Sequence, residues 1–361
     1  MSTCYIDRNQ SETIKGILIL LIVFGHNHVL CPNTEIGGMM DYLYLFHIAG
    51  FFILPFFYKT NKTISIEHIK SLVVRNYVPY FLICLICWLC FSIVSKNFHF
   101  GLDVVLSIFM GTQTHLSSAV GFVFPWFLPT YCSFSIILAC VRNNNWKMIL
   151  LTLFSIWIWT WDWGTFYVFK SSIPLGLGLA VSYFGLGYLT FYIHKFWNKS
   201  YLVAIPCFLF MSIAYWKDLS FSFLYKLFPV FFFLCFLELS RHVDFKFVRI
   251  LGRNSLGIYL FHMFFVNIVY RVFPHNIMWG ILGFIISLLF PLFLTFFIYV
   301  THFYCVKFVK LILAHYFYGN GTVALLTFLL VPMFVIALLI EIGKLFRFYF
   351  PKVYLFTTGN R

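Results

Sequence analysis

A lysine and a histidine in one apolar segment are the first residues whose types and spacing point to chemistry. Lys15 and His26 enclose the stretch KGILILLIVFGH. In a helix, their separation of eleven residues returns both side chains to one face, about 16 Å apart along the axis. A titratable group inside an apolar span is costly and is by default a functional candidate. The same spacing also fits a snorkelling lysine and a histidine that hydrogen-bonds a neighbouring helix.

A basic stretch from residue 59 to residue 75 ends on Arg75, at the mouth of another apolar segment. A guanidinium group offers two parallel N–H donors that match a phosphate group, so Arg75 is a candidate phosphate ligand. The alternative is a charge that only sets the orientation of the segment in the membrane.

Three further apolar segments carry polar or aromatic residues of interest. Ser255, Tyr259 and His262 are spaced i, i+4 and i+7, which places them in one stripe of a helix. Such a stripe can line a site or form hydrogen bonds between packed helices. His47, in FHIAGFF, is another titratable group within an apolar segment. The stretch FPWFLP carries two prolines around Trp126, which predicts a kinked helix beside a cavity.

The elements that must position these side chains are membrane-spanning helices. Of the 361 residues, 62% are hydrophobic and only 10% are charged, whereas soluble domains carry about 25% charged residues. Since about 20 apolar residues cross the lipid core, we predict an all-α, polytopic transmembrane helical bundle of about 10–11 spans. Residues 1–320 are assigned to one membrane domain of about ten spans. Residues 321–361 are assigned to an extra C-terminal transmembrane helix and a short basic tail.

The positions of the basic residues predict the orientation of the bundle. Most Lys and Arg residues fall in alternate loops, and the formal net charge is +14, so the positive-inside rule places the N-terminus in the cytoplasm. The basic tail departs from this rule if the last segment spans. No basic stripe lies outside the apolar segments, which argues against nucleic-acid binding. The apolar segments run over residues 14–30, 42–58, 78–95, 123–141, 148–163, 173–193, 200–216, 227–240, 255–273, 278–304 and 323–342.

Taken together, these segments resemble acyltransferase family 3, the multi-span membrane acyltransferases that modify bacterial surface glycans. The family pattern on the first span is a basic residue, ten intervening residues and a histidine, and Lys stands here in place of the more usual Arg. The Ser-Gly pair that usually follows the family's FH-x-x-x-FF segment is replaced by Leu-Pro. The matching positions are Lys15, Gly16, Gly25 and His26; Phe46, His47, Phe51 and Phe52; Arg75 and Pro79; Pro125 to Leu128; and Gly252, Ser255, Tyr259 and His262.

The resemblance implies O-acetyl transfer from cytosolic acetyl-CoA to a sugar hydroxyl of a lipid-linked or surface polysaccharide, of the O-antigen, capsule or exopolysaccharide type. It implies a location in the bacterial cytoplasmic (inner) membrane, in contact with membrane lipid. His26 would be catalytic, while Lys15 and Arg75 would bind the phosphates of the donor. The expected substrate or cavity residues are His47, Trp126, Ser255, Tyr259 and His262, and no metal is expected.

Two chemical routes and one rival function remain open at this point. A neutral His26 can take the proton of the acceptor hydroxyl as a general base, or it can carry the acetyl group covalently. The rival is a transporter or flippase of a lipid-linked glycan without covalent chemistry. Intramembrane carboxylates, which ion-coupled transport usually needs, are scarce here, since Glu238 and Glu341 lie near the ends of apolar segments.

Overall fold

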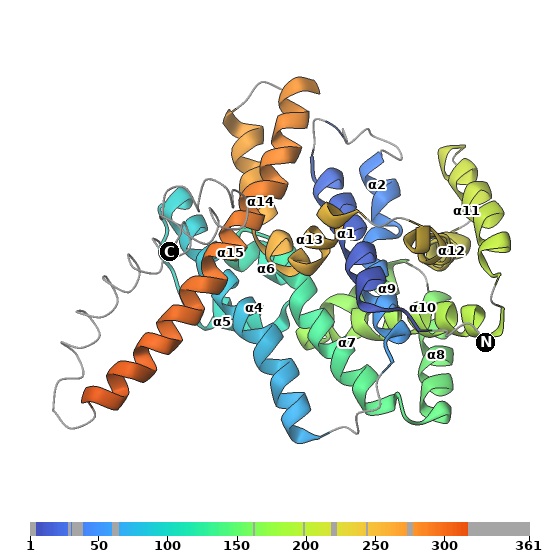
Figure 1. The fold of residues 1–361 in the computed structure, drawn as a ribbon, viewed down its shortest axis with the longest axis horizontal. Helices are drawn as coiled ribbons and strands as arrows, with labels where there is room; N and C mark the ends of the chain where they lie inside the picture. Colours follow the sequence, from blue (N-terminus) through green and yellow to red (C-terminus); the bar gives the residue numbers. More distant parts are fainter. Residues whose placement is uncertain are drawn as a thin grey trace, which may run out of the picture.

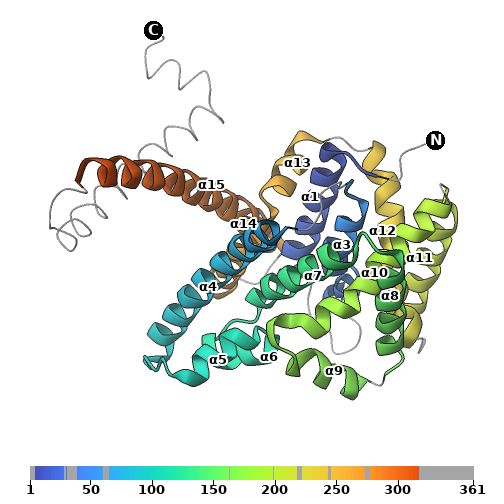
Figure 2. The same ribbon diagram turned by 90° about the horizontal axis from the view of Figure 1, so that it is seen from below.

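The computed structural model describes residues 5–27, 30, 39–59, 65–161, 163–197, 199–217, 222–242, 245–272 and 277–316. Within these ranges every regular element is helical, which confirms the all-α prediction (Figures 1 and 2). The elements are α1 (Arg8–Gly25), α2 (Met39–Tyr44), α3 (His47–Ile53), η1 (Leu54–Phe57), α4 (Ile66–Ser95), α5 (Leu102–Met110), α6 (Gln113–Val120), η2 (Phe124–Trp126), α7 (Phe127–Val141), α8 (Asn145–Trp159), α9 (Trp163–Ser172), η3 (Pro174–Gly176), α10 (Leu177–Phe196), α11 (Tyr201–Trp216), α12 (Ser222–His242), α13 (Lys246–Arg253), α14 (Ser255–Val272) and α15 (Ile277–Tyr316).

Several of these helices have the composition of membrane spans. Four helices of the described part are long and apolar enough to cross a bilayer, over Ile66–Ile93, Phe124–Val141, Pro174–Phe196 and Ile277–Phe296. Shorter apolar helices cover Asp41–Phe57, Asn145–Trp159, Tyr201–Trp216 and Ser255–Val266. Large apolar side chains are exposed along the outer faces of α4 and α11, where lipid is the compatible solvent. The chain is therefore an integral membrane protein with several candidate spans.

Helix α1 is the central element of the bundle. It packs against α3, α12, α13 and α14, which come from widely separated parts of the sequence, and both ribbon views show it next to α13 (Figures 1 and 2). The Asp7 carboxylate caps its first turn by accepting the backbone N–H of Gln10 at 2.7 Å. Its inward side chains, including Ile14, Leu18 and Ile22, are almost fully buried. Residues carried by α1 are consequently fixed relative to most of the bundle.

Two glycines allow α1 and α13 to touch backbone to backbone. A Cβ atom on Gly252 would overlap the carbonyl oxygen of Glu12, and a Cβ atom on Gly16 would overlap the carbonyl oxygen of Val248. Close approach of this kind is the role of small residues in packed membrane helices. Because α14 follows α13 directly, this contact also sets where α14 starts relative to α1.

An ion pair closes the same junction. The Glu12 carboxylate, whose side chain is 7% exposed, accepts hydrogen bonds from Arg253 at 3.0 Å and from Arg8 at 2.9 Å. Burial opposes ionisation of this carboxyl, but the hydrogen bonds from Arg253 and Arg8 outweigh it and hold the pKa of Glu12 below its usual value. The pair therefore remains charged near neutral pH and links α1 to the end of α13.

The predicted segments differ from the helices in three places. The segment 42–58 is not one span but α2, a turn, α3 and η1, with Pro55 at the start of η1. The third segment, predicted to begin at residue 78, is part of a longer helix that begins at Ile66, where the Ser65 side chain caps α4 by accepting from the His68 N–H. The predicted connections contain the additional helices α5, α6, α9 and α13. The segment 323–342 and the basic tail lie outside the described residues.

Candidate functional site

His26 stands at the C-terminal end of α1, where three other aromatic side chains gather around it. The hydroxyl oxygen of Tyr44 lies 2.9 Å from Nδ1 and 3.1 Å from Nε2 of His26. The ring of His262, from α14, is centred 5.2 Å from the His26 ring. His47, on α3, packs edge-on against Tyr44 with a centroid distance of 4.9 Å. The cluster of His26, Tyr44, His47 and His262 therefore joins α1, α2, α3 and α14.

Backbone carbonyls fix the proton positions of His47 and His262. Nδ1 of His262 faces the carbonyl oxygen of Tyr259 at 2.7 Å, and Nδ1 of His47 contacts the carbonyl oxygen of Leu43. A carbonyl can only accept, so Nδ1 carries the proton in both rings, and the neutral Nε2 offers a lone pair. Both side chains are fully buried, and both Nε2 atoms are without a partner among the described residues. Each of these two Nε2 atoms thus keeps an acceptor lone pair that the described residues do not use.

Tyr259 lies one turn before His262 on α14 and anchors that helix to the start of α7. Its hydroxyl donates to the carbonyl oxygen of Phe124, and its ring packs 4.9 Å from the ring of Phe127. These contacts tie α14 to the start of α7 and orient the turn that carries His262. Ser255 begins α14 and lies about 10 Å along the helix axis from His262, so the structure does not bring it into the cluster.

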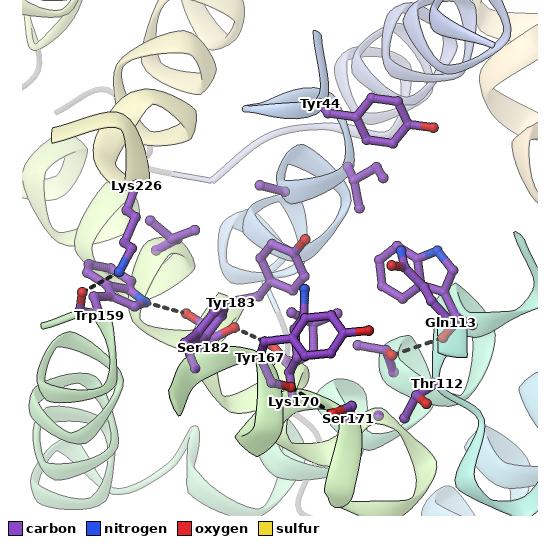
Figure 3. A pocket seen from close by; sticks show the side chains of 18 of the residues that line it. Tyr44, Thr112, Gln113, Trp159, Tyr167, Lys170, Ser171, Ser182, Tyr183 and Lys226 are labelled. Carbon is purple, nitrogen blue, oxygen red and sulfur yellow. Dashed lines mark hydrogen bonds between the residues drawn. The ribbon is translucent and has the colours of Figure 1, made fainter. Parts of the chain in front are cut away.

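A large cavity opens beside Tyr44. It has a volume of about 810 Å³ and is lined by Tyr44, by Trp126 at the end of η2, by the α5–α6 junction and by parts of α8, α9, α10 and α12. Hydroxyl and amide groups such as those of Thr112, Gln113 and Tyr183 face it between aromatic rings (Figure 3). Tyr44 belongs both to the cavity wall and to the histidine cluster, so its side chain lies between the two.

At the other end of α1, cationic side chains gather. The ammonium group of Lys15 lies 5.6 Å from the ring centroid of Tyr58. The hydroxyl of Tyr131, on α7, lies within electrostatic range of both Lys15 and Arg75. Arg142 donates to the carbonyl oxygens of Pro55 and Tyr58 and so holds the end of η1 in place. Lys15 lies about two turns into α1, which begins at Arg8, and with Arg75 and Arg142 it forms a group of cations that we call the basic end of α1.

The predicted site residues thus form two groups rather than one. His26, His47 and His262 lie together in the histidine cluster. Trp126 lines the adjoining cavity. Lys15 and Arg75 belong to the basic end of α1. Sequence reasoning missed four residues that contribute to these groups: Tyr44, Arg142, Lys170 and Lys226. None of these had a local signal that singles it out, since Tyr44 ends α2 and His47 begins α3 after a turn.

No group of three or more His, Cys, Asp or Glu side chains in the described part of the chain is arranged to hold a metal ion. The arrangement offers an imidazole at the C-terminal end of α1, cations beside the N-terminal half of that helix, and a polar, aromatic cavity beside Tyr44. This geometry can bring a phosphate-bearing molecule and a hydroxylated molecule to one imidazole from two sides.

Comparison with known proteins identifies a family for this fold. A family model described as an acyltransferase domain matches residues 8–295, which include both ends of α1, the histidine cluster and all the described helices that line the cavity. No curated protein and no solved structure matches the chain.

Proposed function

This chain belongs to acyltransferase family 3, and we propose that it transfers an acetyl group from cytosolic acetyl-CoA to a hydroxyl of a lipid-linked or surface polysaccharide. One observation carries the proposal. His26 lies on the same helix as Lys15, between the basic end of α1 and the cavity, and contacts the cavity through Tyr44. A group that receives an acyl unit from one side and delivers it to the other must occupy such a position.

The basic end of α1 suits the donor. Coenzyme A carries several phosphate groups, and cations are their natural ligands. The excess of Lys and Arg in alternate loops orients this end towards the cytoplasm, where acetyl-CoA is made. An extended donor with its phosphates at Lys15 and Arg75 would run along α1, over about 16 Å, to present its thioester at His26.

The chemistry at His26 balances by either of two routes. As a general base, the imidazole takes the proton of the acceptor hydroxyl, the oxygen attacks the thioester carbonyl, the C–S bond breaks, and the thiolate leaves with the proton. As a nucleophile, the imidazole nitrogen attacks the carbonyl and expels the thiolate; the acceptor oxygen then attacks the acetyl group, the N–C bond to the imidazole breaks, and the hydroxyl proton passes to the thiolate. Tyr44 serves both routes because its hydroxyl can hold one ring nitrogen while the other reacts.

The decisive experiment follows radiolabelled acetyl groups. Membranes that contain the protein are supplied with [¹⁴C]acetyl-CoA and glycan acceptors, and label is measured on the purified glycan. The proposal expects labelled glycan from which mild alkali releases acetate. Movement of the glycan across the membrane without labelling would instead favour the transporter or flippase.

Loss of either cation at the basic end should weaken donor binding. We expect Lys15→Ala and Arg75→Ala each to raise the KM for acetyl-CoA about tenfold, because one charge-assisted hydrogen bond is worth about 1.5–3 kcal/mol, while kcat changes little. Lys15→Arg should keep activity, whereas Arg75→Lys should restore it only in part, since an ammonium lacks the paired donors of a guanidinium. Lys70→Ala is the matched control, an exposed cation on the same helix as Arg75. An unchanged KM in Arg75→Ala would mean that Arg75 only helps to set the orientation of its helix in the membrane.

Removal of the Tyr44 hydroxyl should slow the chemical step. We expect Tyr44→Phe to lower kcat about ten- to a hundredfold and to leave the KM for acetyl-CoA unchanged, because the lost bond orients a reacting group rather than the donor. Tyr42→Phe provides the control, since Tyr42 lies on the same short helix but pairs with Ser212 of α11 at 2.8 Å. Equal losses in both variants would mean that Tyr44 only stabilises α2.

A further inference from the structure

The Nε2 atom of His262 is a buried hydrogen-bond acceptor that the described residues do not use. The side chain of His262 is fully buried, and its Nε2 atom has no hydrogen-bond partner in the described part of the chain. Nδ1, the nitrogen nearer the backbone, faces the carbonyl oxygens of Tyr259 at 2.7 Å and of Ile258 at 3.2 Å. Because Nδ1 is turned back towards α14, Nε2 points away from the backbone of that helix. A group that donates a proton to Nε2 would remove the cost of burying it without a partner.

His262 packs directly against His26. The two rings are centred 5.2 Å apart, and their planes are inclined by 31°. His47 also has an Nε2 atom without a partner among the described residues, but its ring packs against Tyr44, with a centroid distance of 4.9 Å. His47 and His262 lie within electrostatic range of each other. His262 is therefore the better placed of the two to act on a molecule bound at His26.

A histidine that carries an acetyl group needs a second base for the next step. Once a nitrogen of His26 has bonded to the acetyl carbon, its lone pair can no longer take a proton, and the other ring nitrogen retains its own proton. The hydroxyl of Tyr44, which lies 2.9 Å and 3.1 Å from the two nitrogens of His26, is a weak base. An alcohol oxygen is a poor nucleophile until a neighbouring base takes its proton. A neutral imidazole beside the acetyl group meets this need.

We propose that the transfer is divided between two histidines: His26 carries the acetyl group, and Nε2 of His262 takes the proton of the acceptor hydroxyl. This inference rests on the proposed function and selects its nucleophilic route. In the first step, the His26 nitrogen bonds to the thioester carbon, the C–S bond breaks and the thiolate leaves. In the second step, the acceptor oxygen bonds to that carbon, the N–C bond breaks with its electron pair returning to His26, and the hydroxyl proton moves to His262. The proton then passes to the thiolate, which leaves both imidazoles neutral.

The surroundings of His262 suit it to this task. When Nε2 gains a proton the ring becomes cationic, and the carbonyl oxygens that face Nδ1 stabilise the positive charge. Tyr259 fixes this turn of α14 by donating to the carbonyl oxygen of Phe124. His26 and Tyr44 are only half-buried, and Tyr44 lines the cavity. The acceptor oxygen would therefore reach Nε2 past these two side chains, with a rotation of the His26 ring to admit it.

Separate measurement of the two half-reactions tests the inference. Membranes that contain the full-length chain are mixed with radiolabelled acetyl-CoA alone, and the label on the protein is followed by rapid quenching. Lipid-linked and surface glycan, extracted from cells that naturally express the chain, is then added, and the label on the glycan is followed. In the wild type, we expect acetyl-His26 to form first and its decay to match the appearance of labelled glycan.

His262→Asn is the informative variant, because its amide can still donate to the Tyr259 carbonyl oxygen but offers no base in the place of Nε2. We expect it to form acetyl-His26 at the wild-type rate and to transfer the acetyl group to glycan about 10²–10⁴-fold more slowly. Hydroxylamine, which attacks acyl groups without the help of a base, should release the label from both proteins equally fast. His194→Gln is the matched control, since His194 is buried outside the histidine cluster, and should leave both half-reactions unchanged.

The pH profile of the second half-reaction gives a readout that a purely structural role would not change. A general base acts only in its unprotonated form, so transfer to glycan by the wild type should rise with pH and then level off. In His262→Asn this plateau should disappear, because the group whose titration produces it is gone. A plateau that persists unchanged in the variant would overturn the inference.

The outcomes separate this inference from the proposed function. Absence of labelled glycan in the wild type would refute the proposed function, and the inference with it. Labelled glycan without acetyl-His26, or with the acetyl group on His262, would refute the inference alone. Normal transfer by His262→Asn, or slower release of its label by hydroxylamine, would also refute the inference alone. Loss of both half-reactions in His262→Asn, with a lowered thermal midpoint, would assign His262 to stability and overturn the inference.

Discussion

The His26→Gln variant is expected to lose about 10²–10⁴-fold in the rate of acetyl transfer, the contribution typical of a positioned acid–base group. Glutamine is close to histidine in size and can hydrogen-bond Tyr44, so the fold around α1 should survive. It lacks a nitrogen that can accept a proton or an acyl group, so neither chemical route can proceed. Donor binding should be almost unchanged, because the phosphate ligands that we propose, Lys15 and Arg75, lie apart from His26. Acetyl transfer by membranes, normalised to folded protein, measures the effect.

His194→Gln is the matched control for this variant. His194 is also buried, on α10, with Ser200 as its neighbour at 3.4 Å, and it lies outside the histidine cluster. Its replacement should leave turnover near normal. Near-normal turnover of His26→Gln would refute the mechanism. Mass spectrometry of the wild type, after incubation with donor alone, then distinguishes the routes, since only the nucleophilic route leaves an acetyl group on His26.

The Gly252→Ala variant is expected to be strongly destabilised, although alanine is the better helix former. In an open helix the change from glycine to alanine would stabilise by about 0.5–1 kcal/mol. Here the added methyl group would overlap the Glu12 carbonyl oxygen, and overpacking of a closed contact costs about 1–3 kcal/mol, or more where backbone must move. The close approach of the two backbones therefore makes the net effect of Gly252→Ala on stability unfavourable. Thermal midpoints in detergent, read by size-exclusion chromatography after heating, test it.

Gly25→Ala is the control for that measurement. Gly25 lies on α1, and a Cβ atom there would meet the side chain of Leu43 at 3.5 Å, an ordinary van der Waals distance. Its thermal midpoint should be unchanged or slightly raised. If Gly252→Ala were as stable as Gly25→Ala, the backbone contact between α1 and α13 would not exist in solution.

The placement of Lys15 and His26 on one helix was predictable because its signal is local. Lys15 and His26 share a face through the helical repeat alone, and α1 runs unbroken between them. The partners of His26 depend instead on how distant segments pack. Tyr44 is one of 22 tyrosines, and its spacing from His47 does not single it out. Lys170 and Lys226 converge only because α9 and α12 pack around the same cavity, which no short motif records.

The broken segment at residues 42–58 escaped prediction for a different reason. Apolar composition is the same for a spanning helix and for short helices buried inside protein, so hydropathy cannot separate them. Pro55 marks the start of η1, but the turn between α2 and α3 at residues 45 and 46 contains neither proline nor glycine. In contrast, the early start of α4 had a readable signal, since Ser65 is a good N-cap and Glu67 favours a first turn.

The early start of α4 has a consequence for the entropy of donor binding. Arg75 projects from the third turn of a continuous helix, and Lys15 projects from α1, so neither cation is carried by a flexible loop. Ordering a mobile side chain and its backbone on association costs about 0.5–1.5 kcal/mol per side chain. In this protein the backbone of both residues is already ordered when the helices fold. The cost of ordering that backbone is therefore not incurred again when a ligand binds. In the donor-binding role proposed for Lys15 and Arg75, the backbone of both residues is then already ordered before acetyl-CoA binds.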